Sequence, residues 1–158
     1  MQKAVFTNIL DVTTSMTGIQ ALLADPRRLH EWVPDIQSVT AVAAQFQVTR
    51  GAGALNKHEV ITVTNSGTMI TYHSRQGWLE YDLVFTLRQV TAGVQIQEDL
   101  YLLDENNLPL SLLAPIAKRK KLPYVTRFNY IVRKCKEGIG HKRLMSQRPF
   151  FSCDYLLT

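Results

Sequence analysis

The sequence predicts an α+β domain in which an antiparallel β-sheet is covered by a long C-terminal helix. Apolar and polar residues alternate along several short segments between 36 and 103, which is the period of half-buried strands. Short turn sequences separate these segments, so neighbouring strands are expected to pair antiparallel. Apolar residues recur at steps of three and four within 124–139, which predicts a helix with one apolar stripe that covers the sheet.

The N-terminal part predicts one strand and two short helices. Residues 3–12 are rich in β-branched and apolar residues and are expected to form the first strand. A helix over 14–24 follows, with Ser15 among its candidate N-caps. Asp25 is expected to cap a second short helix that Pro34 ends. This helix carries Trp32, and because so short a helix is unstable alone, Trp32 must pack on something larger.

The rest of the chain predicts strands over 36–43, 55–64, 69–75, 78–88 and 94–103, with turns at 51–54, 65–68 and 90–93. The alternation is clearest in 78–88, where one face carries Leu79, Tyr81, Leu83, Phe85 and Leu87. A helix or turn near 109–117 and the basic run 118–121 are expected before the main helix. The apolar stripe of that helix consists of Val125, Phe128, Val132, Cys135 and Ile139.

Composition indicates an ordinary globular chain. Its 158 residues suit a single domain, and 46% of them are hydrophobic. No signal peptide and no apolar run long enough to span a membrane is evident, which favours a cytoplasmic protein. Two cysteines, Cys135 and Cys153, do not make a disulfide framework.

The net charge of +5 is unevenly distributed along the chain. Residues 1–117 carry 7 Lys and Arg against 11 Asp and Glu, a balance of −4, whereas residues 118–158 carry 11 against 2, a balance of +9. This basic region is either a surface that meets RNA, the ribosome or an anionic membrane, or a solvated helix face whose Lys and Arg stems cover apolar surface. The solvated face is favoured, and the other reading stays open.

Three stretches resemble a known superfamily: DPRRLHEWVPDIQSV (25–39), the turn-separated strands, and PLSLLAPIAKRKK (109–121) ahead of the last helix. Together they resemble the SRPBCC superfamily, in particular its polyketide cyclase/dehydrase-like branch. The resemblance covers about residues 3–140, so one domain is expected over 1–140. A C-terminal extension over 141–158 would pack on that domain or on a partner subunit. Two departures from the family are a short segment between the second and third strands and this extension.

The resemblance implies a START-like helix-grip fold, in which a curved antiparallel sheet wraps around the long helix and leaves an elongated cavity. The two short helices after the first strand would close one end of it. Trp32 would then act as a plug that rests on the sheet and the long helix. The alternative is that Trp32 only fills a core with no cavity beside it.

The sequence contains no nucleotide-binding, metal-ligand or nucleophile motif, so neither a cofactor nor a metal is expected. Glu98 is the sharpest candidate for chemistry, because it falls on the apolar side of its strand, where an unpaired carboxylate is costly. It either serves a ligand or proton transfer, turns outward at a bulge, or pairs with an Arg. The hydroxyl of Tyr81 needs a partner: Glu98, a water or a ligand.

Two strands leave open which side chains face inward. On 69–75 either Tyr72 or the pair His73 and Arg75 can do so, and His58 on 55–64 is equally undecided. The expected cavity lining combines candidates from all these elements: Trp32, Tyr72, Leu79, Tyr81, Leu83, Phe85, Ile96, Glu98, Leu100, Val125, Phe128 and Val132.

The function expected from this lining is the binding, or transport, of a small hydrophobic or amphipathic molecule such as a lipid. One alternative is a cyclase/dehydrase-type enzyme in the same cavity, with Glu98 as acid and Tyr81 as donor. Another is an interaction protein that binds nucleic acid, the ribosome or an anionic membrane through its basic C-terminal region. The apolar tail, which contains Phe150, Phe151 and Leu156, also leaves a homodimer open.

Overall fold

The computed structural model describes residues 3–103, which form a seven-stranded antiparallel sheet and two short helices. The helices are α1 (Met16–Ala24) and α2 (Leu29–Trp32), with a 3-10 turn over Pro26–Arg28 between them. The strands are β1 (Phe6–Val12), β2 (Ile36–Val42), β3 (Gln45–Arg50), β4 (His58–Asn65), β5 (Met69–Arg75), β6 (Tyr81–Val90) and β7 (Gly93–Leu102). The predicted helix over 124–139, the segments 109–121 and 141–158 and both cysteines lie outside the described residues.

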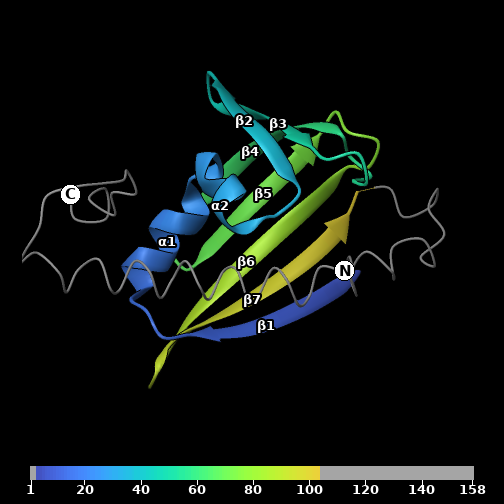
Figure 1. The fold of residues 1–158 in the computed structure, drawn as a ribbon. Coiled ribbons are helices and arrows are strands. Elements are labelled where there is room, and N and C mark those ends of the chain that lie inside the picture. The colour runs from blue at the N-terminus through green and yellow to red at the C-terminus, as the bar shows by residue number, and fades with distance from the viewer. Residues whose placement is uncertain (1–2, 104–158) are drawn as a thin grey trace, which may run out of the picture.

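The sheet has the order β1-β7-β6-β5-β4-β3-β2. Strands β2 to β7 are joined as consecutive hairpins, which is the predicted meander. The first strand does not begin this meander; it pairs with the last strand, from Phe6↔Leu100 to Val12↔Val94. Figure 1 shows β1 beside β7 at one edge of the sheet and the β2–β3 hairpin at the other edge. This closure places residues of the N-terminal strand directly opposite Glu98.

The caps of the two N-terminal helical segments are those that the sequence predicts. The Ser15 hydroxyl accepts a hydrogen bond from the Gly18 amide at 3.1 Å. The Asp25 carboxylate accepts one from the Arg27 amide at 3.1 Å. These side chains replace the helical bonds that the first amides of a helix lack. Helix α1 then buries Ile19 and Leu22 against the sheet, where it contacts β4, β5 and β7.

Trp32 packs on the middle of the sheet. Its side chain is 1% exposed, and its ring meets Phe85 of β6 edge to face, with ring centroids 6.1 Å apart. Phe85 in turn meets Tyr72 of β5 at 5.6 Å in the same type of contact. Such aromatic pairs are stabilised beyond the area they bury. The expectation that Trp32 rests on the sheet is therefore confirmed, and its expected contact with the C-terminal helix lies outside the described residues.

The structure contains one strand that the sequence does not predict. No element is expected over 44–50, whereas β3 occupies Gln45–Arg50 and forms a hairpin with β2. The connecting residues, Ala43 and Ala44, contain no Gly, Asn or Pro, so the sequence carries no turn signal there. Ala43 nevertheless adopts a φ of 53°. The next strand, β4, begins at His58 instead of the predicted residue 55.

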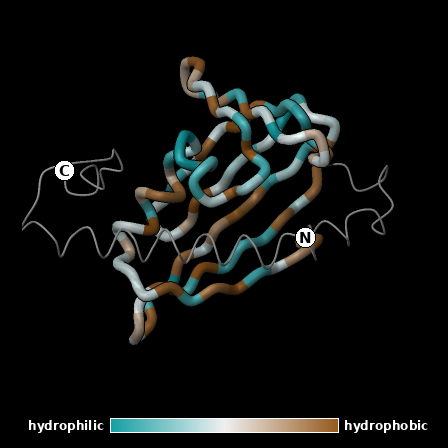
Figure 2. The backbone as a smooth tube through the Cα atoms, in the orientation of Figure 1, coloured by the Kyte–Doolittle hydropathy of each residue, from teal (hydrophilic) through white to brown (hydrophobic). Residues whose placement is uncertain are grey.

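The hydrophobic core lies between the two helices and the inner face of the sheet. In Figure 2 hydrophobic residues, in brown, lie along α1 and alternate with hydrophilic residues along the strands. A smaller buried cluster of Leu79 and Leu102, with Val5 packed against it, lies at the end of the sheet where β6 begins. Within residues 3–103 no helix has the length and apolar character needed to cross a bilayer.

The β6–β7 turn gives a test of this packing. Gly93 has a φ of +146°, and a Cβ there would lie 2.1 Å from the Val12 carbonyl oxygen. We expect Gly93→Ala to lower the free energy of unfolding by about 3 kcal/mol or more, because backbone strain adds to a clash that only a shift of β1 relieves. Urea unfolding measures the loss.

The matched control is Gly67→Ala, where φ is +81° but no atom lies within 4 Å of the added Cβ. Strain alone should cost about 1 kcal/mol there. Equal losses in the two variants would contradict the close approach of β1 to this turn.

Candidate functional site

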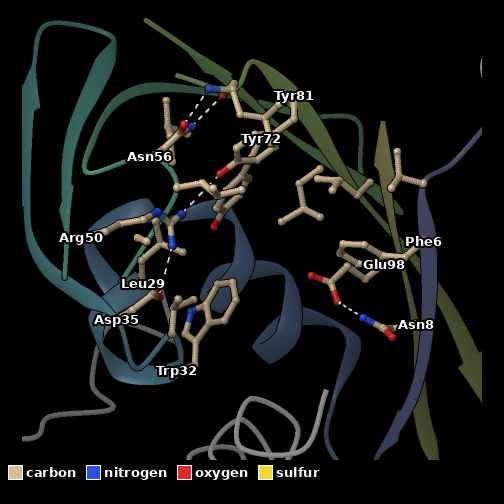
Figure 3. Close-up of a pocket in the computed structure, with 18 of the residues that line it drawn as sticks. Phe6, Asn8, Leu29, Trp32, Asp35, Arg50, Asn56, Tyr72, Tyr81 and Glu98 are labelled. Carbon is tan, nitrogen blue, oxygen red and sulfur yellow. Dashed lines mark hydrogen bonds and ion pairs between the residues drawn. The ribbon is translucent and has the colours of Figure 1, made fainter. Parts of the chain in front are cut away.

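A pocket of about 190 Å³ lies between the inner face of the sheet, α2 and the β3–β4 loop. Most of its wall is apolar, and Figure 3 shows its polar side chains gathered at separate places on the wall. Seven of the predicted lining residues do line it: Trp32, Tyr72, Leu79, Tyr81, Leu83, Glu98 and Leu100.

Two predicted lining residues lie elsewhere among the described residues. Phe85 is buried in the core, in edge-to-face contact with the rings of Trp32 and Tyr72, and does not line the pocket. Ile96 is aligned with Leu10 and Leu87, nearer the other end of the sheet, where it is part of the core. Neither residue lines this pocket. The predicted cavity also involves the helix over 124–139, so the assignment of Phe85 and Ile96 to its lining stays a prediction. Val125, Phe128 and Val132 lie outside the described residues.

Arg50, the last residue of β3, provides the cation of the pocket. Its Nε donates to Glu59 Oε1 at 2.6 Å, Nη1 to Asp35 Oδ1 at 3.3 Å and Nη2 to the Tyr81 hydroxyl at 3.3 Å. The Arg50 side chain is 10% exposed, and that of Glu59 is completely buried. Figure 3 shows Arg50 reaching from β3 towards Asp35 and Tyr81 at one side of the pocket.

Glu59 is the centre of the hydrogen bonds around Arg50. Its Oε2 accepts from Asn56 Nδ2 at 3.0 Å, from the Ser74 hydroxyl at 2.5 Å and from the Tyr81 hydroxyl at 3.0 Å. These donors come from the β3–β4 loop, β5 and β6, so one carboxylate ties together segments that are distant in sequence. A buried carboxylate with this number of donors is strongly favoured in its charged form.

The pKa values of Arg50, Glu59 and Tyr81 are all shifted away from neutral pH. Burial alone would raise the pKa of Glu59, but the charge of Arg50 and the hydrogen bonds from Asn56 and Ser74 outweigh it and hold the pKa below its ordinary value. Burial raises the pKa of the Tyr81 hydroxyl, and the Glu59 charge raises it further, against the opposing charge of Arg50. The cluster therefore holds one guanidinium, ionised Glu59 and protonated Tyr81 across the neutral range.

Glu98 lines the opposite part of the pocket wall, on the inner face of β7, as predicted. It accepts a hydrogen bond from Asn8 Nδ2 at 3.0 Å, and Asn8 is its direct partner in the β1–β7 ladder. The register of that ladder runs without a shift, which excludes the bulge that would have turned Glu98 outward. The side-chain amide of Asn8 is thus the partner of Glu98 on β1, the strand that lies outside the meander.

The partner proposed for Tyr81 was wrong in part. The sequence suggested Glu98, a water or a ligand, whereas the Tyr81 hydroxyl donates to Glu59 and accepts from Arg50. Glu59 follows an exposed residue, His58, and precedes Val60, so its inward position depends on the register of β4. The sequence leaves open which face of 55–64 points inward, and the pairing of β4 with β3 places Glu59 opposite Val48 on the inner face.

The structure shows which side chains of β5 face inward. Tyr72 points inward, is 2% exposed and donates its hydroxyl hydrogen to the Leu23 carbonyl at the end of α1. His73 and Arg75 point to the outer face, where both contact Asp82, each at 2.9 Å. His58 is exposed as well.

Several residues of the site were missed, above all Arg50, Asp35, Asn56 and Asn8. Arg50 ends a strand that carries no turn signal, although the alternation of Phe46 and Val48 was a signal for it. Asn56 lies in a loop, and its burial follows only from the bonds that join this loop to β6. Within residues 3–103 no three His, Cys, Asp or Glu side chains are grouped so that they could hold a metal ion.

No known protein-family profile matches the chain, and no curated protein matches it in sequence. Solved structures do match. A START superfamily protein from Mycobacterium smegmatis superposes with a TM-score of 0.68 at 15% identity, over 82% of this chain and 97% of the other. A STAR-related lipid transfer protein from Xanthomonas axonopodis superposes with a TM-score of 0.58 at 12% identity, over 80% of this chain and 84% of the other.

A third similar structure is BexL, a di-domain ARO/CYC protein from the BE-7585A biosynthetic pathway. It matches with a TM-score of 0.66 at 12% identity, and this chain spans 46% of its length. At such identities the likeness establishes the fold. The described part of the chain, the sheet and two short helices of residues 3–103, therefore has the START-like fold that the resemblance implied.

The lowered pKa of Glu59 makes the free energy of unfolding depend on pH. A folded-state pKa below the ordinary value of about 4.3 stabilises the protein above that pH, and the contribution is lost as pH falls through the folded-state pKa. We expect Glu59→Gln to cost about 3 kcal/mol at pH near 7, because it removes the charge that balances buried Arg50. Its stability should then fall less than that of the wild type on acidification below about pH 5.

Urea unfolding at a series of pH values measures both effects. Glu80→Gln is the control, since Glu80 is an exposed acid near the same end of the sheet. A pH profile of Glu59→Gln parallel to the wild-type profile would refute the assignment of a depressed pKa to Glu59.

Proposed function

We propose that this protein binds a compact apolar molecule that carries a neutral oxygen at one end. The observation that carries the proposal is the combination of a mostly apolar wall with an immobilised guanidinium, that of Arg50. Apolar pockets with a few convergent polar groups are the usual form of small-molecule sites. The apolar wall would supply affinity, and Arg50 would supply orientation.

The size of the pocket limits the ligand. Its volume of about 190 Å³ is only slightly larger than an apolar cavity of about 150 Å³ that accommodates benzene. Sites for drug-sized molecules are larger, about 300–1,000 Å³. The proposed ligand, or the part of it that enters this pocket, therefore has on the order of ten non-hydrogen atoms.

The charges around Arg50 favour a neutral polar group. Arg50 is flanked by two carboxylates, Asp35 and Glu59, so a further carboxylate on the ligand would add a third negative charge. Residues 3–103 accept hydrogen bonds from three of the five N–H groups of Arg50. The remaining N–H groups suit the oxygen of a carbonyl or a hydroxyl.

The expected affinity is modest. Burying about 300 Å² of apolar ligand surface contributes roughly 7 kcal/mol. Association costs at least about 4 kcal/mol, so the apolar contacts by themselves support a Kd in the millimolar range, and hydrogen bonds to Arg50 would bring it towards micromolar. Two similar structures are named as a STAR-related lipid transfer protein and a di-domain ARO/CYC protein, and the first of these names supports a small apolar ligand.

A cyclase/dehydrase-type enzyme is the second candidate, and Glu98 is the observation that favours it. Its carboxylate lines the pocket, across from the Arg50 cluster, where it could exchange a proton with a bound carbonyl compound. The Arg50 cluster itself does not suit proton transfer, because Glu59 is held ionised and Tyr81 is held protonated. Binding is therefore the primary proposal. An interaction through the basic region 118–158 and a cytoplasmic location both stay predictions.

Filling the pocket tests the binding proposal. We expect wild-type protein to bind a naphthol, a compact ring system with a neutral hydroxyl, and to bind the matching naphthoate about tenfold more weakly because of Asp35 and Glu59. Leu83→Trp should weaken naphthol binding at least tenfold, since its ring would occupy the pocket. Calorimetry measures both.

Thr86→Trp is the matched control, because it adds the same ring to the exposed outer face of the same strand. Native mass spectrometry of the purified wild type adds an independent test for a co-purified small molecule. A folded protein that binds neither naphthol nor any co-purified compound would contradict the proposal.

Glu98→Gln separates binding from catalysis. The amide keeps the size of the side chain and removes its proton chemistry. If the protein only binds, naphthol affinity should change less than about threefold, since Glu98 lies across the pocket from Arg50. Loss of a detected turnover of a carbonyl substrate with unchanged binding would instead support the enzyme.

A further inference from the structure

Strand β2 forms one edge of the sheet, and within residues 3–103 no strand pairs with its other side. Every second residue of an edge strand directs its backbone N–H and C=O away from the sheet. Such unpaired groups attract a further strand, and proteins protect them with charged side chains, with proline or with a covering segment. The protection that an edge carries therefore indicates whether it is open to a partner.

Neither charge nor proline protects this edge. Residues 36–49, which comprise β2, the turn and most of β3, contain no Asp, Glu, Lys, Arg, His or Pro. A bulge between Ile36 and Ser38 disturbs the start of β2. From Ser38 to Val42 the pairing with β3 is regular, so residues 38–42 form a continuous template for a further strand.

The outer part of the β2–β3 hairpin is exposed on both faces. Thr40 and Ala41, whose side chains point to opposite faces, are both exposed, and so are the turn residues Ala43 and Ala44. Val42 is apolar and 47% exposed. Figure 1 shows the tip of this hairpin projecting from the rest of the fold. An exposed apolar stretch along an unpaired edge is a feature of interaction sites.

The other edge of the sheet, β1, is of a different kind. It carries Asp11, which is exposed and accepts a hydrogen bond from Gln95 at 3.0 Å. A strand that paired with this edge would lie beside a negative charge, which is one of the devices that discourage edge-to-edge contact. The two edges are therefore unlike, and β2 is the edge that suits an uncharged partner.

We propose that two copies of this chain pair through β2, antiparallel to each other, so that their sheets join into one. A second copy fits this edge because an uncharged strand that pairs with itself brings no like charges together. The longest overlap of residues 38–42 with their own copy is centred on Thr40. The residues opposite each other are then Thr40 and Thr40, Val39 and Ala41, and Ser38 and Val42.

This arrangement is closed and favourable in its side-chain pairs. Threonine opposite threonine is a stabilising pair in antiparallel sheets. Because the same edge is used in both copies, the assembly ends after two chains, whereas a contact of β2 with β1 of the next copy would continue into a filament. Antiparallel copies are related by a twofold axis normal to the sheet, so both pockets lie on the same side of the joined sheet.

The interface is small, and the dimer is accordingly weak. One strand pair buries less than the roughly 1,200–2,000 Å² that stable protein–protein interfaces bury. We therefore expect a Kd of about 10–100 μM and exchange between monomer and dimer. The pairing requires no ligand, so it is measured on the protein alone and is independent of the function proposed above.

Sedimentation velocity of the full-length protein over about 1–500 μM is the first experiment, and the average mass should rise from one chain towards two. Thr40→Lys should raise the Kd at least tenfold, because it places two positive charges opposite each other. Thr86→Lys is the matched control, since it makes the same change on the outer face of central strand β6 and should leave the Kd unchanged. Leu83→Trp, which fills the pocket, should dimerise as the wild type does.

Thr40→Cys tests the pairing register directly. Opposite residues of an antiparallel pair have Cα atoms about 4.5–5.5 Å apart, which is within the range of a disulfide. Mild oxidation should join two copies at position 40, and peptide mapping distinguishes this link from one through Cys135 or Cys153. Thr86→Cys is the control and should give no link between the introduced cysteines.

A protein that stays monomeric over the whole concentration range would overturn the proposal. A dimer that Thr40→Lys does not weaken, and in which position 40 forms no link, would overturn it as well. Such a dimer would be formed elsewhere, for example through the tail over 141–158. Assembly that continues beyond two chains would count against the twofold pairing and in favour of an open-ended contact.

Discussion

The structure depends on the burial of one charged group, the Glu59 carboxylate. Such a group is tolerated only when a cation and several donors surround it, because its hydration is lost. Arg50 supplies the cation, and Asn56, Ser74 and Tyr81 supply the donors. These residues come from β3, the β3–β4 loop, β5 and β6, so satisfying one charge fixes the relative position of half the sheet. The polar side of the pocket is a consequence of this requirement.

The same requirement connects the pocket to the surface. Asn56 serves Glu59 with its amide hydrogens and also holds Leu79 through both its amide oxygen and its amide nitrogen. The loop that carries Leu55 is therefore anchored to the loop that carries Trp78 by Asn56, which also donates a hydrogen bond to the buried carboxylate. The buried ion pair of Arg50 and Glu59 and the positions of exposed Leu55 and Trp78 thus depend on one hydrogen-bonded unit.

Much of the fold was predictable because local physics dictated it. The caps at Ser15 and Asp25 satisfy amides within three residues of themselves, and the strand over 69–75 has the predicted bounds. The inner face of β6 follows from simple alternation. The site was less predictable, since Arg50 and Glu59 meet only through the pairing of β3 with β4, and the β2–β3 turn contains two alanines without a turn signal. Glu98 was found by its pattern, but its partner Asn8 follows from the pairing of β1 with β7.

By itself the sequence left the orientation of Glu98 open, but it determined the fold class, the two short N-terminal helices, most strands of the meander and the inward positions of Trp32 and Tyr81. Each of these depends on the periodicity of neighbouring residues or on a cap, which are interactions within a few positions along the chain. Only the tertiary structure decided which charge is buried, which cation balances it, which side of β5 faces the pocket and how Asn56 joins the β3–β4 loop to Leu79. Those features arise from contacts between residues far apart in sequence, and the pairing register that brings them together is not encoded in any single segment.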